Sequence, residues 1–153
     1  MTVSGDRPGD AVSFRSSSFS LELPKDPSSG RSYDLPLGDD LAAYLRAQML
    51  EREPSLSIDG PILEDWGSVL LVCDRDVVYV LSIHWVPWKR DDDDRWGIQF
   101  HKRRGCLAAL LGPKPSAAGC APVQALVQKV LTADTARFRE VEWLSQDAYE
   151  ARM

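Results

Sequence analysis

Two adjacent carboxylates, Glu64 and Asp65, stand directly before Trp66 and Gly67 and form the first pattern that could do chemistry. Such a pair can bind a metal ion or act as acid and base when a third group lies near. Because successive side chains of a strand point to opposite faces, the pair can serve one site only where the backbone is irregular. We therefore interpret the pair as the solvated entrance of a strand that Trp66 anchors by packing.

The two histidines, His84 and His101, form the second pattern. Imidazoles on one sheet face can bind zinc or shuttle protons. If a hairpin turns near residues 90 and 91, His84 lies opposite Gly97 and His101 lies opposite Val80. The two imidazoles then share a face but stand roughly 13 Å apart, whereas a hairpin centred two residues further on would pair them directly. Because no His-Glu-x-x-His spacing is present, we interpret them as half-exposed sheet residues.

The third pattern is an acidic loop beside a tryptophan, made of Trp88, Asp91, Asp92, Asp93 and Asp94. The aspartates lack the Asp-x-Asp-x-Asp-Gly spacing of a calcium loop. Repulsion between them keeps such a loop extended in water or held by a cationic partner. An exposed tryptophan here is suited to an interface hot spot, and it could equally cap the end of the sheet. A solvated loop is the simpler interpretation, and a docking site for a basic partner is the functional one.

The bulk composition limits the classes of function. The 153 residues carry a net charge of -5, with 44% hydrophobic and 27% charged residues, as in an ordinary folded protein. The chain lacks the basic footprint of a nucleic-acid binder and any apolar run near the roughly 20 residues of a membrane span. Its three cysteines indicate neither a disulfide framework nor a zinc ribbon. With no phosphate loop or nucleophile elbow, we expect a cytoplasmic protein without a cofactor, a metal or an assigned catalytic residue.

The elements that must position these residues follow from periodicity. Residues 1–11 are predicted to be a flexible tail, and residues 12–153 a single α+β domain. Alternation predicts strands at residues 12–23, 66–73, 77–86, 95–104 and 138–144, and a short one around Leu56 and Ile58. Helical spacing predicts helices from an N-cap at Asp39 to Arg52 and from Pro122 to Leu131, with a short polar helix after Ser145. A helix continued through Tyr149 is the alternative for the C-terminal strand, and residues 106–111 fit a strand or a helical turn.

The stretch from Gly60 to Gly67 resembles a recurrent feature of small bacterial α+β proteins, in which a Glu-Asp-aromatic-Gly run opens a central strand. Some of these proteins are immunity proteins that neutralise secreted polymorphic toxins. The resemblance covers residues 60–83, and the proline-rich stretch after Gly112 has no counterpart in it. Because immunity proteins act by binding, the resemblance carries over no catalytic residue and implies a protein partner, most concretely a basic toxin.

Together these patterns predict an α+β fold with a mainly antiparallel sheet of about five strands packed with two principal helices. The functional hypothesis is a non-enzymatic binding protein, an immunity-type inhibitor whose acidic loop and Trp88 contact a basic toxin. The first alternative is a metal-dependent hydrolase or small-molecule enzyme that uses the two histidines with Glu64 or Asp65. The second is an oligomeric ligand-binding domain, such as a homodimer whose apolar sheet face is completed by a second subunit.

Overall fold

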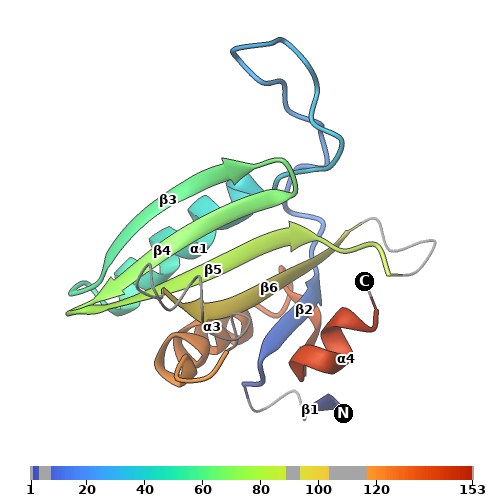
Figure 1. Cartoon of the computed structure of the whole chain (residues 1–153). Helices are drawn as coiled ribbons and strands as arrows, with labels where there is room; N and C mark the ends of the chain where they lie inside the picture. Colours follow the sequence, from blue (N-terminus) through green and yellow to red (C-terminus); the bar gives the residue numbers. More distant parts are fainter. Residues whose placement is uncertain (1, 4–7, 89–93, 104–116, 153) are drawn as a thin grey trace, which may run out of the picture.

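A seven-stranded sheet forms the frame of the computed structural model, which describes residues 2–3, 8–88, 94–103 and 117–152 (Figure 1). The strands are β1 (Thr2–Val3), β2 (Ala11–Arg15), β3 (Ser57–Glu64), β4 (Gly67–Asp74), β5 (Val77–Trp85), β6 (Arg95–Lys102) and β7 (Arg139–Leu144). The described helices are α1 (Asp39–Arg52), α3 (Ala121–Ala133) and α4 (Gln146–Glu150). The strand order is β1-β7-β2-β6-β5-β4-β3, and every neighbouring pair is antiparallel. The predicted α+β class and its two principal helices are confirmed, and the sheet is larger than expected.

The alternation along β5 and β6 divides the sheet into two unlike faces. The side chains that face α1 and α3 are apolar and buried; in these two strands they are Tyr79, Leu81, Ile83, Trp96, Ile98 and Phe100. The residues between them, such as Ser82 and Gln99, point to the opposite face, which we call the open face. Because both principal helices pack on one side, one face of the sheet is buried in the core beneath them. The open face is not covered by these two helices.

The two principal helices lie on the same face and contact each other. Their buried residues recur at helical spacing: Leu41, Ala42, Leu45 and Met49 in α1, and Val123, Leu126, Val127, Val130 and Leu131 in α3. Burying each large aliphatic side chain contributes about 1.5–3 kcal/mol, so these stripes hold both helices to the sheet. The N-cap of α1 is Gly38 and not Asp39, which instead stands with Asp40 in the first turn.

Strand pairing extends closer to the N-terminus than the predicted domain boundary. Within residues 1–11, Thr2 and Val3 pair with β7, and Ala11 opens β2. At the other end of the chain, β7 and the short helix after Ser145 form as predicted. Among the described residues, no helix is both long and apolar enough to cross a membrane. Residues 106–111, whose sequence fits a strand or a helical turn, lie outside the described residues.

The predicted strand over residues 12–23 is wrong beyond Arg15, where the chain leaves the sheet. Phe19 is buried against Tyr44 and Phe138, whereas Leu21 and Leu23 are 38% and 48% exposed. Ser16 and Ser20 accept hydrogen bonds from the backbone amides of Ser18 and Glu22, which are therefore not paired with another strand. Alternation alone therefore did not distinguish a strand from a looped segment with one buried side chain.

Strand β3 is longer than the short strand predicted around Ile58. It continues past Gly60 and Pro61 through a register shift between Asp59 and Ile62. Gly60 has a φ of 115°, and a Cβ at this position would lie 2.6 Å from the carbonyl oxygen of Val69. Only glycine fits both the conformation and the close approach, so the Gly-Pro pair bends the strand without ending it.

Helix α4 covers one end of the open face with a small second core. Its Tyr149 is buried with Ala11, Val86 and Leu144. The ring stands directly over Gly97, where a Cβ would collide with the phenol oxygen. Gly97 is therefore the position on β6 that makes room for Tyr149.

Replacing Gly97 with alanine should expel the Tyr149 ring and lower the free energy of unfolding by about 1–3 kcal/mol. Urea denaturation measures this loss. In a Tyr149→Ala background the same substitution should cost little, because the ring that it meets is gone. Equal losses in both backgrounds would contradict this packing.

Candidate functional site

Trp88 closes the second core and does not project from the sheet. Its ring lies 5.4 Å from that of Tyr149, and the guanidinium groups of Arg95 and Arg152 stand 5.6 and 5.1 Å from its centre. The indole nitrogen is buried and has no hydrogen-bond partner. Of the two roles predicted for Trp88, this geometry favours the cap over the exposed hot spot. The neighbouring residues Asp91, Asp92 and Asp93 lie outside the described residues.

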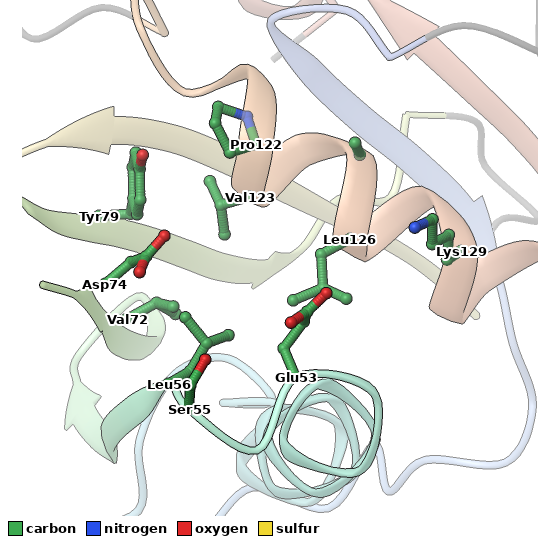
Figure 2. A pocket seen from close by; sticks show the side chains of 11 residues that line it. Glu53, Ser55, Leu56, Val72, Asp74, Tyr79, Pro122, Val123, Leu126 and Lys129 are labelled. Carbon is green, nitrogen blue, oxygen red and sulfur yellow. The ribbon is translucent and has the colours of Figure 1, made fainter.

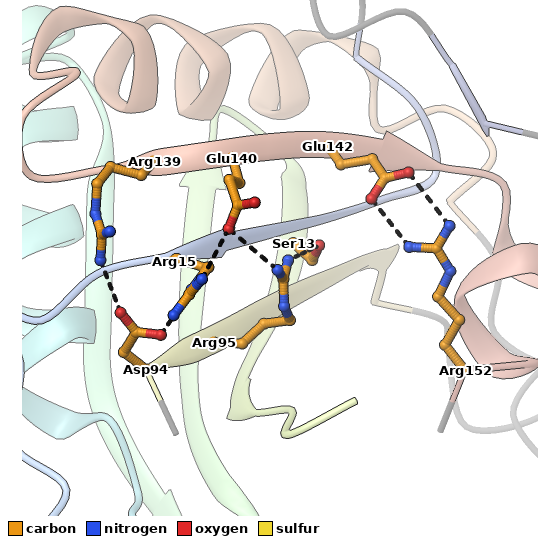
Figure 3. A network of polar contacts seen from close by, with 8 residues as sticks. All are labelled: Ser13, Arg15, Asp94, Arg95, Arg139, Glu140, Glu142 and Arg152. Carbon is orange, nitrogen blue, oxygen red and sulfur yellow. Dashed lines mark hydrogen bonds and ion pairs between the residues drawn. The ribbon is translucent and has the colours of Figure 1, made fainter. Parts of the chain in front are cut away.

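Asp94 is held by arginines and is 9% exposed. Its carboxylate accepts hydrogen bonds from Arg15 Nε at 2.8 Å and from Arg139 Nη2 at 2.7 Å (Figure 3). Burial alone would raise the pKa of Asp94, but the hydrogen bond and charge of Arg15, with the charge of Arg139, lower it. Asp94 therefore fastens β6 to β2 and β7, and its charge is already balanced.

The same polar network continues across the three strands (Figure 3). Glu140 accepts from Arg15 at 3.2 Å and from Arg95 at 3.4 Å. Arg95 also donates to Ser13, and Arg152 pairs with Glu142 at 2.9 Å. The network joins residues as far apart in sequence as Arg15 and Glu140, so no local pattern of residues indicates it.

His84 lies opposite Gly97 and His101 opposite Val80, as predicted for a hairpin centred near residues 90 and 91. The two imidazoles therefore are not paired across the strands. His84 is 6% exposed, and its Nε2 lies 2.6 Å from the Tyr149 hydroxyl. Burial lowers the pKa of His84 from 6.5 to about 4, so the imidazole that shares this hydrogen bond with the Tyr149 hydroxyl is neutral at neutral pH.

Glu64 and Asp65 stand at the turn of the β3–β4 hairpin and are exposed. Residues 65 and 66 form the turn itself, and the run leads directly into β4, which lies between β5 and β3 in the sheet. Within the described residues, no three histidine, cysteine or carboxylate side chains gather as metal ligands. The predicted set of Glu64, Asp65, His84 and His101 is not brought together as one cluster.

A hollow of about 300 Å³ opens beside Trp66 on the open face. Its lining combines aromatic, aliphatic and neutral polar side chains: Leu35, Trp66, Ser82, His84, Trp85 and Gln99. Ser82 and Gln99 are direct cross-strand partners, and the His84 ring meets Trp66 edge to face at 6.3 Å. An apolar hollow with a few neutral hydrogen-bonding groups is the usual chemistry of a binding pocket.

Residues 20–36 form a projecting segment that we call the finger (Figure 1). Backbone contacts join its two arms. Lys25 and Ser32 form an antiparallel β-bridge, and the Tyr33 amide donates to the Pro24 carbonyl at 2.8 Å. The Asp26 carboxylate accepts from the Ser28 amide and from two serine hydroxyls, which lowers its pKa. These contacts give the finger a defined shape at the surface.

Two hydrogen bonds fix the base of the finger to the domain. The Ser20 amide donates to Asp40 Oδ2 at 2.7 Å, at the start of α1. The buried Ser68 hydroxyl donates to the Leu37 carbonyl at 2.6 Å, at the start of β4. The finger therefore stands beside the β3–β4 turn, and its Leu35 lines the hollow next to Trp66.

We define the finger end as residues 20–40 and 62–67. Within the described residues, all the large exposed apolar side chains belong to it: Leu21, Leu23, Ile62, Leu63 and Trp66. It also carries seven carboxylates against two basic side chains, a net charge of -5 that equals the charge of the whole chain. The remaining residues sum to zero, so the exposed apolar side chains and the net negative charge belong to the same two segments of the chain.

The sequence analysis did not find this surface because it assigned Trp66 to packing and placed Leu21 and Leu23 in a strand. Trp66 is 39% exposed. The signal that could have found it is the failed alternation at Leu21 and Leu23, which left two leucines without a strand to bury them.

Comparison of the chain with protein-family models, with curated proteins and with solved structures gives no match. The resemblance to immunity proteins stays a prediction.

Acidification should destabilise the protein through His84. The unfolded histidine has a pKa near 6.5 and the folded one about 4, so below pH 6.5 the unfolded state binds more protons. Stability is therefore lost as the pH falls from about 6.5 to 4. Between pH 7 and pH 5 this group should cost about 2 kcal/mol.

Urea denaturation of the protein and of His84→Gln at both pH values measures that contribution. The loss between pH 7 and pH 5 should be larger in the unsubstituted protein by about 2 kcal/mol. If both proteins lose the same free energy, His84 is not buried in the neutral form.

Proposed function

We propose that this chain is a non-enzymatic binding protein whose finger end docks a basic protein, in the manner of an immunity-type inhibitor. The observation that carries the proposal is the coincidence of exposed apolar side chains and net charge at the finger end. Monomeric proteins rarely expose such apolar groups together unless they contact something. The acidic surround makes a basic partner the complementary one.

Trp66 is the central contact of this interface. Tryptophan is enriched among residues that dominate binding energy, above all where the partner excludes water around them. The hollow beside it can receive an apolar or aromatic side chain of the partner, and Ser82 and Gln99 can hydrogen-bond a polar tip. The binding energy thus comes from Trp66 and the hollow.

The carboxylates of the finger end act mainly on the rate of encounter. Glu64 and Asp65 are exposed and flank Trp66, so they remain solvated until the partner arrives. Exposed charges of this kind accelerate association and lose their effect as salt is raised. Their role differs from that of Asp94, whose charge is held by arginines.

Calorimetry with basic proteins encoded beside this gene tests the proposal. Trp66→Ala should weaken a measured complex by at least about 2 kcal/mol, roughly thirtyfold in Kd. Glu64→Gln with Asp65→Asn should slow association about tenfold at low salt and less at high salt.

Two controls give the test its specificity. Glu51→Gln with Asp76→Asn removes the same charge from exposed positions away from the finger end and should leave association nearly unchanged. The rival surface is probed by Trp88→Ala with asparagine at residues 91–94. A complex that resists Trp66→Ala but is lost with the rival variant would refute docking at the finger end.

A further inference from the structure

A second hollow lies where the end of α1, the β4–β5 hairpin and the first turns of α3 meet (Figure 2). Its volume is about 210 Å³. No residue of the finger end lines it, and it opens beside the helix-covered face of the sheet. It is therefore a separate site that neither the proposed interface nor the second core uses.

The inner wall of this hollow is apolar. Val72, Val123 and Leu126 are 1%, 3% and 7% exposed, and Figure 2 shows the last two projecting from α3 into the space. An engineered apolar cavity of about 150 Å³ is enough to bind benzene. The hollow thus has room for one ring with a short polar arm.

The mouth of the hollow is negatively charged. Glu53 and Asp74 stand there against a single cation, Lys129, and no ion pair among the described residues involves any of the three. Glu53 caps the C-terminal end of α1, where the helix dipole disfavours an anion and favours a cation.

Arg52 stands in the last turn of α1 and offsets the helix dipole there, but it forms no ion pair with Glu53 or Asp74 in the described part of the chain. Arg52 turns back and donates to the carbonyl and side-chain oxygens of Gln48. Inside the hollow, burial first, and then the charges of Asp74 and Cys120, raise the pKa of the Tyr79 hydroxyl.

We propose that this hollow binds a small organic amine, with a ring-sized apolar body against Val123 and Leu126 and a primary ammonium between Glu53 and Asp74. An ammonium supplies the cation that the two carboxylates lack, and its apolar body displaces water from the buried wall. A neutral ligand of the same shape gains only the displacement of water from the buried wall, and an anion is repelled by the carboxylates at the mouth.

Titration of the full chain with benzylamine, followed by amide NMR shifts, tests the site. Benzylamine is protonated at pH 7, and it should shift the amides of Asp74, Tyr79 and Val123 in a saturable way. Its neutral isostere, benzyl alcohol, should bind at least about fivefold more weakly. Glu53→Gln and Asp74→Asn should each weaken benzylamine about 2- to 5-fold and leave benzyl alcohol unchanged.

Glu51→Gln is the matched control, because it removes one exposed carboxylate from the same helix outside the hollow. It should leave benzylamine binding unchanged, and the same spectra show whether each variant remains folded. The proposal is overturned by the absence of saturable shifts, by equal affinity for benzyl alcohol, or by equal weakening from Glu51→Gln. Each outcome is independent of docking at the finger end.

Discussion

The antiparallel ladder between β5 and β6 is the constraint on which the rest of the structure depends. Its register sends one set of side chains into the core under α1 and α3 and the other set to a face that these helices do not cover. The same register puts His84 opposite Gly97, and the missing side chain of Gly97 admits Tyr149. Helix α4 thus covers one end of the open face, whereas the apolar side chains of the finger end remain in contact with water.

The charged side chains also differ between the α4 end of the open face and the finger end. Near α4 the charged groups are matched, because Asp94 and Glu140 bind arginines from two other strands and Glu142 binds Arg152. Exposed ion pairs contribute little to stability, but a partly buried and hydrogen-bonded set fixes the relative position of strands. With that end balanced, the net charge of the chain resides at the finger end, beside its exposed tryptophan.

Much of the fold could be predicted from sequence because local patterns determine it. The alternation from Val77 to Phe100 predicted the central hairpin, whose register stayed open between two centres, and helical spacing predicted α1 and α3. The pattern misled at Leu21 and Leu23, where no partner strand exists to complete the alternation. Periodicity shows which side chains of one segment could be buried. It does not identify the second strand with which that segment would have to pair.

The candidate site was harder to predict for the same reason. Trp88 and Asp94 stand in a polar stretch that reads as a solvated loop, and only the fold brings Tyr149, Arg15 and Arg139 to them. Conversely, Trp66 reads as a core residue next to an apolar strand and is exposed, because it stands in the turn of a hairpin. The contacts that bury Trp88 and Asp94 thus come from segments distant in sequence, whereas the exposure of Trp66 follows from the turn in which it stands.

The most direct test of the central claim is amide hydrogen exchange of this chain, free and bound to a basic protein encoded beside its gene. The account predicts that binding protects the amides of residues 20–40 and 62–67 and leaves those of α4 unchanged. Protection confined to α4 and the residues around Trp88, with none at the finger end, would contradict it.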